Sequence, residues 1–330
     1  MSEIHNNLNQ DVELVIIDGA STDGTSEELF RYCNSRENIR FEVESCNSGL
    51  DRGYDRCVEI SSGKYCWLLS DDDKLKPGAI NKVVTLLKSQ NHDLFIANSE
   101  VWDSTFSSCL IDNQLKLGGD IELFSDQNDE LLIKAGSILS FIGSVIIKRS
   151  EWLNREREAY FGSWFIHIGV IFQDPLPCGA FIISDPLIQI RYGVASWSGK
   201  SFDIWMKSWP KLIWSMSKIS DSAKKLVVPK WPGRSIFKHI LFNSHSVTFS
   251  RASLTIPTRD VFRRLLIMSV YLLPCVFCNI IVSIGCLLSL KSRRLILYDM
   301  AHCSSSNFIS RWLYKRSCRH LSKVILHGSQ

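Results

Sequence analysis

Short apolar runs alternate with helix-like segments over the first 80 residues of the chain. Residues 13–17 (ELVII) and 39–43 (IRFEV) are strand-length runs of mainly β-branched and aliphatic side chains. A helix-like segment follows each run, one from Thr25 and one that ends at Ile60, just before a Ser-Gly pair. Runs of this length predict strands, and strands that alternate with helices predict a parallel α/β sheet.

The run at residues 65–73, YCWLLSDDD, is the most informative of these segments. Its apolar part is continuous, so we expect a central strand that is buried on both faces of the sheet. The strand ends in three adjacent carboxylates, which repel one another unless a cation lies among them. Divalent cations take oxygen ligands, and Mg²⁺ often bridges a carboxylate to substrate phosphates. The alternative is a solvated acidic turn or a helix N-cap, where Asp is common.

A second acidic loop, DGASTDGT, begins at Asp18 and follows the first predicted strand. Thr25 starts the next helix with Glu28 three residues later, which is the spacing of a capping box. Ligands of open α/β sheets bind beyond the carboxyl ends of the strands. We therefore expect Asp18 and Asp23 at the same edge of the sheet as residues 71–73, although a loop of this kind could also be a plain turn.

Four motifs in this order resemble the family 2 glycosyltransferases, which have the nucleotide-diphospho-sugar transferase fold. They are DGASTDGT at 18–25, NSGLDR at 47–52, SGKY at 62–65 and SDDD at 70–73. The segments GLDRGY and YCWLLSDDD are most similar to the abequosyltransferase-like branch, whose members build bacterial O-antigen and related surface polysaccharides. The similarity is clear from Val12 to about Gly78 and continues more weakly to about Trp209.

The resemblance implies a fold, a reaction and a set of site residues. The fold is α/β, a Rossmann-like nucleotide-diphospho-sugar transferase fold of glycosyltransferase A type, with a mainly helical, basic C-terminal region. The reaction is the inverting, metal-dependent transfer of a sugar from a nucleotide-sugar donor to a lipid-linked oligosaccharide. The residues implied at the donor are Asp18, Ser21, Asp23, Asp51, Arg52, Asp71 and Asp72. Asp73, together with Asp71, would hold the divalent metal, Mn²⁺ or Mg²⁺, which offsets charge on the departing nucleoside diphosphate.

The beginning of the chain departs from the family pattern. Family members usually open with an apolar strand that ends in a Pro-Thr-Tyr-Asn-like loop, and a helix follows. Residues 1–10 are short and polar here, so the first strand of the fold is expected to be missing. Its absence would expose apolar strand edges, which favour aggregation. The competing interpretation is therefore a truncated, inactive pseudoenzyme or a fragment that binds only a membrane or partners.

The catalytic base is not marked by a clear motif. Inverting enzymes of this family commonly use an acidic residue, well after the metal motif, to take the acceptor hydroxyl proton. The corresponding stretch from Tyr160, YFGSWFIHIG, has no acidic pair and contains His167. Histidine titrates near neutral pH and suits this work, although His167 could also be a packed core residue. We expect His167 or Asp174 to be the base, with Glu158 as an alternative.

Charge divides the chain into two parts. Residues 1–199 carry 17 Lys and Arg against 30 Asp and Glu, whereas residues 200–330 carry 21 against 4. We expect a glycosyltransferase domain over 1–199, truncated at its N-terminus, and a basic Trp-rich helical region over 200–264. A hydrophobic, membrane-associating segment over 265–290 and a basic tail over 291–330 follow. A strongly basic region predicts an anionic partner surface, either a membrane or a nucleic acid.

The apolar run at 265–290 decides between these partners. Its 26 residues carry no charge and are long enough to span a bilayer core. Basic residues flank both ends, and Pro274, Asn279 and Gly285 could instead bend the run into a re-entrant hairpin or an interfacial helix. A buried helical pair in a soluble domain is the remaining alternative. We expect the partner to be a bacterial cytoplasmic membrane rather than a nucleic acid, with the catalytic domain on the cytoplasmic side.

Overall fold

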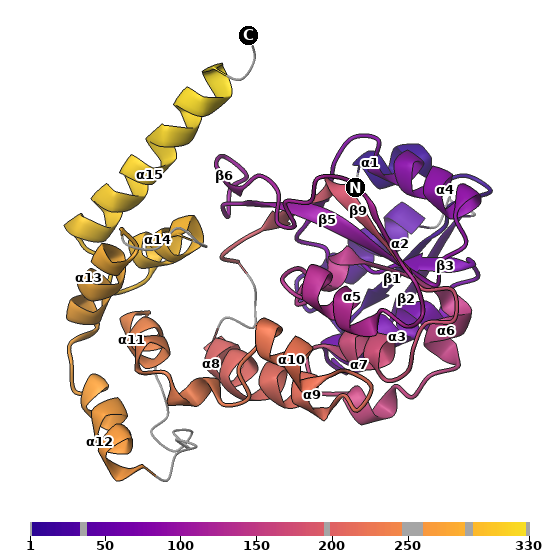
Figure 1. Cartoon of the computed structure of the whole chain (residues 1–330). Helices are drawn as coiled ribbons and strands as arrows, with labels where there is room; N and C mark the ends of the chain where they lie inside the picture. Colours follow the sequence, from indigo (N-terminus) through magenta and orange to yellow (C-terminus); the bar gives the residue numbers. More distant parts are fainter. Residues whose placement is uncertain (1, 34–37, 195–198, 246–259, 288–292, 328–330) are drawn as a thin grey trace. The chain divides into compact units, whose positions relative to one another are not determined.

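The computed structural model describes residues 2–33, 38–194, 199–245, 260–287 and 293–327 (Figure 1). These residues form two compact units, and each unit is described by itself. The first unit comprises Met1–Val101, Asp112–Arg191 and Lys211–Pro229. The second comprises Trp102–Ile111, Tyr192–Pro210 and Lys230–Gln330.

The first unit holds most of the strands. Its elements are α1 (Ser2–Asn7), β1 (Leu14–Asp18), α2 (Thr25–Cys33), β2 (Ile39–Val43), α3 (Leu50–Ile60), β3 (Tyr65–Trp67), β4 (Lys74–Leu75), α4 (Ala79–Ser89), β5 (Leu94–Trp102), β7 (Ile121–Leu123), α5 (Asn128–Ala135), η1 (Ile142–Ser144), β8 (Val145–Lys148), α6 (Arg149–Leu153), η2 (Glu158–Tyr160), α7 (Ile166–Phe172), β9 (Ala180–Arg191) and α10 (Asp221–Val227).

The second unit is mainly helical. Its elements are β6 (Cys109–Ile111), α8 (Ser201–Asp203), η4 (Ile204–Ser208), η5 (Pro232–Arg234), α11 (Ile236–Ser244), α12 (Val261–Val270), α13 (Cys275–Gly285), α14 (Arg293–His302) and α15 (Phe308–His327). Helix α9 (Trp209–Ser215) begins in the second unit and ends in the first.

The strands of the first unit belong to two sheets. β1 and β2 pair in parallel, from Leu14 opposite Ile39 to Asp18 opposite Val43. The larger sheet has the strand order β3-β8-β5-β9-β4, and β7 also pairs with β9. Its pairings β3–β8, β5–β8, β4–β9 and β7–β9 are antiparallel. The predicted α/β class is confirmed, but the expected parallel arrangement is wrong for these pairings, because apolar patterning reports a strand's burial and not its neighbour's direction.

Two strands are less enclosed than their apolar sequences predicted. β3 stands at one end of the described strand order rather than at its centre, and only Cys66 of its three residues is buried. In β1, Leu14 to Ile17 are half-buried and only Asp18 is buried. Continuous hydrophobicity therefore located both strands correctly but overstated how much of each strand is covered.

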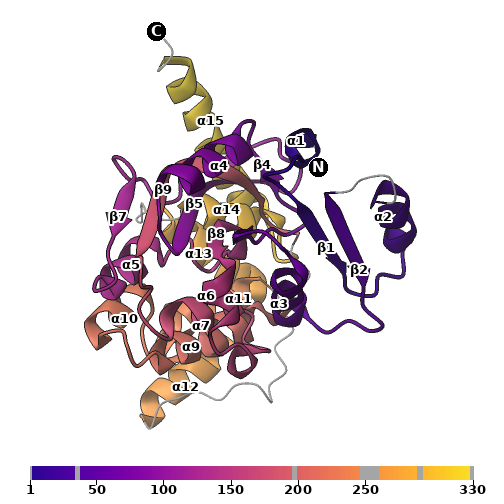
Figure 2. The ribbon, with the colours of Figure 1, turned by 90° about the vertical axis from the view of Figure 1, so that its right-hand side faces the viewer.

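The apolar core of the first unit lies between the larger sheet and α4. Ala79 and Val83 on one face of α4 pack against Phe95 of β5, Ile146 of β8 and Ile183 of β9, all of which are buried. Figure 2 shows α4 running alongside β5 and β9. The helical spacing of Ala79 and Val83 gives α4 this buried face, so the core fixes the strands whose ends carry the acidic residues.

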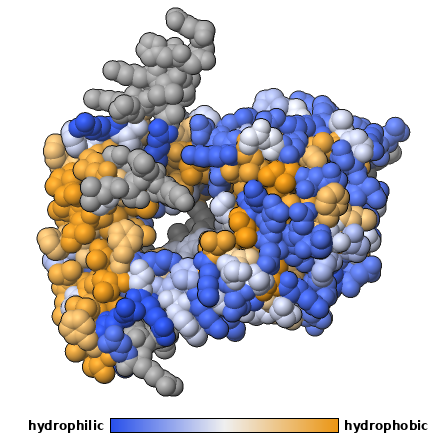
Figure 3. Space-filling model, in the orientation of Figure 1, coloured by the Kyte–Doolittle hydropathy of each residue, from blue (hydrophilic) through white to orange (hydrophobic). Residues whose placement is uncertain are grey.

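The second unit encloses a core between α11, α13, α14 and α15. Its buried cluster contains Val282 and Cys286 from α13, Leu297 and Met300 from α14, and Leu313 from α15. Apolar side chains also gather on the surface over α12 and α13 (Figure 3). This unit is therefore covered in part by the kind of side chain that normally forms a core.

The apolar run predicted at 265–290 is divided between two helices. No single helix among the described residues is both long and apolar enough to cross a membrane. α12 and α13 together meet that condition, but their axes bend by 103° at the break between them. Residues 288–290 of the run, residues 246–259 of the expected basic region, and residues 291–292 and 328–330 of the tail lie outside the described residues.

A buried ion pair joins three strand ends in the first unit. Asp93, which is 1% exposed, directly precedes β5, and its Oδ1 lies 3.1 Å from Nζ of Lys148 at the end of β8. Its Oδ2 accepts the backbone N–H of Cys178, just before β9, at 2.6 Å. Because one carboxylate meets partners from both neighbours of β5, it fixes the relative positions of these three strands.

Replacing Asp93 with Ala is expected to lower the free energy of unfolding by about 2–3 kcal/mol, because Lys148 and a backbone N–H lose a buried partner. Asp185→Ala provides a matched control. Asp185 pairs with Lys82 at 2.7 Å, but its side chain is 74% exposed, so the expected loss is below about 1 kcal/mol. Urea unfolding followed by circular dichroism measures both values, and equal losses would contradict the role given to Asp93.

Candidate active site

Three carboxylates lie in the turn between β3 and β4. Asp71 is exposed, whereas Asp72 and Asp73 are half-buried. Asp73 is held from two sides, since its Oδ1 accepts the backbone N–H of Arg191 at 2.9 Å and its Oδ2 lies 2.6 Å from Oγ of Ser70. Ser70 Oγ also lies 2.7 Å from Oδ1 of Asp72. The end of β9 and the end of the β3 segment thus fix the direction in which Asp73 points.

The electrostatics of this cluster favour a positive ligand. Burial, reinforced by the neighbouring carboxylates of Asp72 and Asp71, raises the pKa of Asp73 to about 6, although the hydrogen bonds from Ser70 and Arg191 act in the opposite direction. Like charges at close range disfavour ionisation of one another. A cation among these side chains would remove that penalty, so the cluster is suited to hold one.

Tyr54 of α3 belongs to the same cluster, although the sequence analysis did not select it. The side chain is 9% exposed. Burial raises the pKa of its phenol, and the carboxylates of Asp73, Asp72 and Asp71 raise it further. The phenol therefore stays protonated in the electrostatic field of the three acids. Its place on the buried face of α3, together with Asp51, Asp55 and Val58, is the sequence signal that could have revealed it.

The loop that follows β1 turns its first carboxylate inward. Asp18 is 5% exposed, and its carboxylate accepts hydrogen bonds from the backbone N–H and hydroxyl of Ser21 and from the hydroxyl of Ser26. Burial acts to raise the pKa of Asp18, but these hydrogen bonds outweigh it and hold the pKa below its usual value. The structure brings Asp18 and Ser21 together in one ionised, hydrogen-bonded loop.

Asp23 is exposed and sits at the start of α2. Its Oδ1 accepts the hydroxyl of Thr25 at 2.6 Å and the backbone N–H of Thr25 at 3.1 Å, and these bonds lower its pKa. The Thr25 hydroxyl is thus directed to Asp23, whereas the capping-box spacing predicted a bond to the backbone N–H of Glu28. The backbone N–H of Glu28 instead donates to the carbonyl of Gly24 at 3.2 Å.

Asp51 lies in the first turn of α3 and is buried against the loop that precedes α7. Its Oδ2 accepts the backbone N–H of Trp164 at 3.0 Å, and its Oδ1 accepts that of Ile166 at 3.1 Å. Burial raises its pKa although these bonds oppose the change. Trp164 has φ of +73°, a backbone conformation that is costly for a non-glycine residue. Asp51 therefore fixes a strained loop in this structure, and its carboxylate points toward protein groups.

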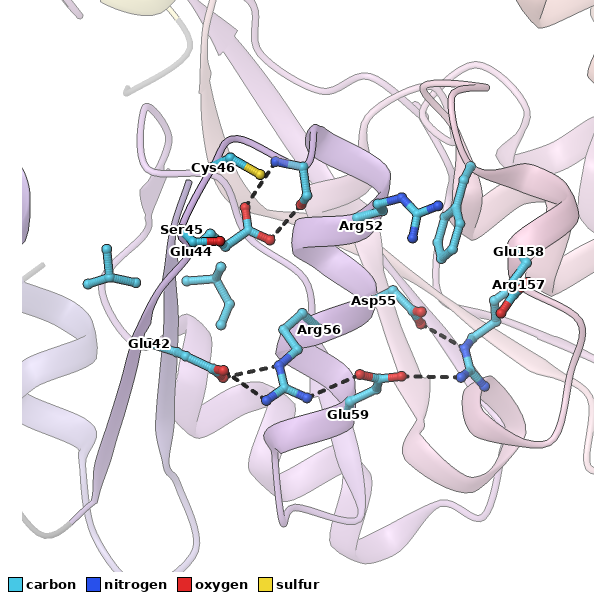
Figure 4. A pocket seen from close by; sticks show the side chains of 14 residues that line it. Glu42, Glu44, Ser45, Cys46, Arg52, Asp55, Arg56, Glu59, Arg157 and Glu158 are labelled. Carbon is cyan, nitrogen blue, oxygen red and sulfur yellow. Dashed lines mark hydrogen bonds and ion pairs between the residues drawn. The ribbon is translucent and has the colours of Figure 1, made fainter. Parts of the chain in front are cut away.

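Arg52 lines a cavity of about 610 Å³ in the first unit (Figure 4). Its guanidinium lies 4.2 Å from the centre of the Phe161 ring. The remaining lining residues are Ile17, Glu42, Val43, Glu44, Ser45, Cys46, Ser48, Asp55, Arg56, Glu59, Arg157 and Glu158. Of the residues predicted at the donor, only Arg52 is among them. Residues 71–73 are not among the residues that line the cavity.

A chain of ion pairs closes one side of this cavity (Figure 4). Arg56 binds Glu42 through two hydrogen bonds of 2.8 and 3.1 Å, and it also reaches Glu59 at 3.3 Å. Arg157 then joins Glu59 at 3.4 Å and Asp55 at 2.8 Å. Two of the three arginines that line the cavity are thus neutralised by protein carboxylates, which limits the attraction of this wall for an anion.

The three candidate bases have different surroundings. His167 of α7 is 1% exposed, and its Nε2–H donates to the carbonyl of Leu139 at 2.8 Å. Burial lowers the pKa of His167 to about 4. Asp174 is exposed, and its carboxylate lies 4.0 Å from Nζ of Lys218. Glu158 is exposed and lines the cavity beside Arg157. The surroundings of His167 favour the packed-histidine alternative, and only the two carboxylates are open to solvent.

The acidic cluster has the donor atoms that a hard cation needs. The described residues contain no group of three or more His, Cys, Asp or Glu side chains that could hold a metal ion by themselves. Mg²⁺ often uses one or two carboxylates and takes its other ligands from substrate phosphates and water. The carboxylates of Asp71 and Asp73 fit this mode. Burial and the neighbouring negative charges raise the pKa of Asp73, and a bound cation would offset those charges.

His167 should make stability depend on pH in a specific direction. Its pKa in the folded protein, about 4, is below the usual value of about 6.5 for an unfolded chain. As pH falls from 6.5 to 4, the unfolded state takes up a proton that folded His167 does not, so folding loses up to about 3 kcal/mol. His167→Gln should lose less stability over this range. Denaturant unfolding at several pH values checks this, and identical pH profiles would show that His167 titrates normally.

The chain is similar to known proteins in sequence and in fold. Residues 3–132 match the family model for glycosyl transferase family 2. The chain is 28% identical over 199 residues to the abequosyltransferase RfbV of Salmonella typhimurium. The matched region covers 56% of this chain and 58% of RfbV. It is 30% identical over 79 residues to the putative teichuronic acid biosynthesis glycosyltransferase TuaG of Bacillus subtilis. That match covers 24% of this chain and 31% of TuaG.

Solved structures show the same fold. The crystal structure of residues 1–349 of S. aureus TarS in complex with UDP superposes with a TM-score of 0.51 and covers 97% of this chain and 87% of TarS 1–349, at 13% sequence identity. The chain spans less than two thirds of the length of the two curated relatives. Residues 3–132 are therefore similar to the family 2 glycosyltransferases, and over 199 residues the chain is similar to an abequosyltransferase.

Proposed function

We propose that this chain is an inverting, metal-dependent glycosyltransferase of bacterial surface polysaccharide synthesis. It would move a sugar from a nucleotide-sugar donor to a lipid-linked oligosaccharide at the cytoplasmic face of the membrane. The observation that carries the proposal is the acidic cluster at the end of β3, where Asp73 is oriented by Ser70 and by the backbone of Arg191. The similarity to RfbV and TuaG supports the reaction class and the polysaccharide context.

A nucleotide-sugar donor is supported from two directions. TarS, which shares the fold, has been solved in complex with UDP. In this chain, the loop of Asp18 and the turn of residues 71–73 both follow the carboxyl end of a strand, where open α/β sheets bind ligands. We assign the nucleoside to the Asp18 loop, with Ser21 and Asp23, and the sugar or ribose of the donor to Asp71 or Asp72.

The metal would lie at Asp73 and Asp71. When bound, a divalent cation supplies positive charge that offsets the charge developing on the departing nucleoside diphosphate. The protein's own contribution is orientation. The backbone N–H of Arg191 and the hydroxyl of Ser70 hold the Asp73 carboxylate in one position.

We assign the base to Glu158 rather than to His167. A base must come within hydrogen-bond reach of the acceptor hydroxyl, and His167 is buried with its Nε2–H committed to Leu139. Glu158 is exposed and lines the cavity that also contains Arg52 and the Phe161 ring. Asp174 is equally exposed but is absent from the cavity lining, so it is the second choice.

Asp73→Asn is expected to abolish the gain in nucleotide affinity that a divalent metal provides. An amide has no charge and is a poorer ligand for a hard cation than a carboxylate. Calorimetric titration with UDP, with and without Mn²⁺, measures this gain. Asp185→Asn, at an exposed position on β9, serves as the control and should retain it. If Asp73→Asn binds UDP with the same Mn²⁺ dependence as the wild type, the metal assignment fails.

Glu158→Gln is expected to lower turnover by about 10²–10⁴-fold, the usual contribution of a general base, with little change in donor affinity. Asp174→Asn and His167→Gln should retain turnover in proportion to the folded protein. Sugar transfer is followed with a nucleotide-sugar donor, and donor binding is measured separately by calorimetry. A large loss in Asp174→Asn alone would move the role to Asp174. Donor binding without any transfer by the wild type would favour the pseudoenzyme.

A further inference from the structure

Helix α13 buries its polar side chains on its inner face, beside core residues such as Val282, and exposes large apolar side chains on its outer face. Asn279 and Ser283 are both 0% exposed. On the outer face, Phe277 is 50% exposed and Ile284 is 47% exposed, and Leu287, just after the helix, is 46% exposed. A helix on the surface of a soluble protein normally carries polar side chains on its outer face, and the outer face of α13 is apolar instead.

The inward polar groups are fully used inside the second unit. Asn279 donates to the carbonyl of Met300 at 2.9 Å and to Oγ of Ser305 at 3.1 Å. Its side-chain oxygen accepts from Asn307 at 2.9 Å and from Ser283 at 3.3 Å. Helices that face lipid turn their polar side chains toward the bundle interior in this way. The network therefore fixes α13 with its apolar face outward.

Helix α12 and the turn after it extend the apolar surface (Figure 3). Phe262 is 69% exposed, Leu265 is 59% exposed and Leu272, in the turn, is 78% exposed. The exposed large apolar residues over both helices are Val261, Phe262, Leu265, Leu266, Met268, Leu272, Leu273, Val276, Phe277, Ile281, Ile284 and Leu287. A contiguous apolar surface of this kind marks an interaction site on a soluble protein.

The charges around this surface identify the partner. Arg263 and Arg264 are exposed on α12. On α15, which packs against α13, Arg311, Lys315 and Arg316 are exposed. Across residues 230–330 the sequence has 15 Lys and Arg but only Asp260 and Asp299 as acids. Apolar side chains beside many cations complement a leaflet of anionic lipid, which offers acyl chains and negative headgroups together.

The geometry of the pair favours insertion into one leaflet. α12 has 10 residues and α13 has 11, so each helix is about 15 Å long, half of the hydrocarbon thickness of a bilayer. The 103° bend prevents them from forming one continuous span. We propose that α12 and α13 form an interfacial element that inserts their outer apolar side chains into a single leaflet of an anionic membrane, with Arg263 and Arg264 among the headgroups.

This inference names the membrane contact of the proposed glycosyltransferase, but it rests on the second unit alone. Donor binding belongs to the first unit, so the two properties can fail independently. The apolar surface could otherwise be covered by a second copy of the chain or by another protein. Both would bury the same residues without any need for lipid, and they would leave binding insensitive to headgroup charge.

The experiment is flotation of the full chain with vesicles of phosphatidylcholine alone or mixed with phosphatidylglycerol. The wild type should float with the mixed vesicles. Ile281→Glu and Ile284→Glu should each lower the partition coefficient about tenfold or more, because a carboxylate opposes both the acyl chains and the anionic headgroups. Leu226→Glu is the matched control, at a position of α10 in the first unit that is 72% exposed, and it should float like the wild type.

The same proteins distinguish the competing outcomes. Undiminished flotation of Ile281→Glu and Ile284→Glu would overturn the proposal, as would a lipid-free dimer that these variants dissociate and that does not float. Calorimetric titration with UDP confirms that each variant is folded in the first unit, and thermal unfolding reports on the second. Finally, alkaline carbonate should release the wild type from cell membranes, whereas retention after this wash would indicate a spanning segment and contradict interfacial insertion.

Discussion

Three carboxylates at the end of an apolar strand are the constraint on which the site of this protein depends. Left alone, Asp71, Asp72 and Asp73 repel one another, and burial adds to the cost of charging Asp73. The chain offsets part of this cost with two hydrogen bonds to Asp73, one from Ser70 and one from the last residue of β9. The remaining cost of charging Asp73 is seen in its raised pKa. A cation with a bound diphosphate is the ligand that would remove this cost.

The scaffold explains how these acids come to be held in place. β9 supplies the Arg191 N–H, and its position depends on β5 and β8, to which the buried carboxylate of Asp93 ties it. On the other side, α3 places Tyr54 in the electrostatic field of the acids and places Asp51 against the loop before α7. One helix therefore serves both the acidic cluster and the strained loop at Trp164. In the second unit, α13 buries the polar side chains of Asn279 and Ser283 and exposes large apolar side chains on its outer face.

Much of the local structure was accessible from the sequence. Two strands, at 14–18 and 39–43, lie where the apolar patterns placed them, and so do the helix that begins at Thr25 and the helix that ends at Ile60. These short segments were predictable because turn residues bound them. Strand direction was not accessible, since antiparallel pairing joins segments as distant as β3 and β8. The bend between α12 and α13 was anticipated only as one alternative, because Pro274 permits a break without requiring it.

The candidate site was less predictable than the fold. The acids at 71–73 were visible as a cluster in sequence, but the partners of Asp73 were not, because Arg191 contributes a backbone N–H rather than its side chain. Tyr54 was missed for a similar reason, since an aromatic residue on an amphipathic helix normally signals core. Titration chemistry alone suggested His167 as a base, whereas its burial depends on the packing of α7, which the sequence does not specify.

The central claim is that a divalent metal and the donor diphosphate bind at Asp73. A crystal grown with Mn²⁺ and UDP tests it directly through the anomalous scattering of manganese. The account predicts an anomalous peak at coordination distance, about 2.2 Å, from a carboxylate oxygen of Asp73 and in contact with the diphosphate. A peak at the carboxylates of the cavity around Glu42 and Glu158, or UDP bound with no manganese near Asp73, would contradict it.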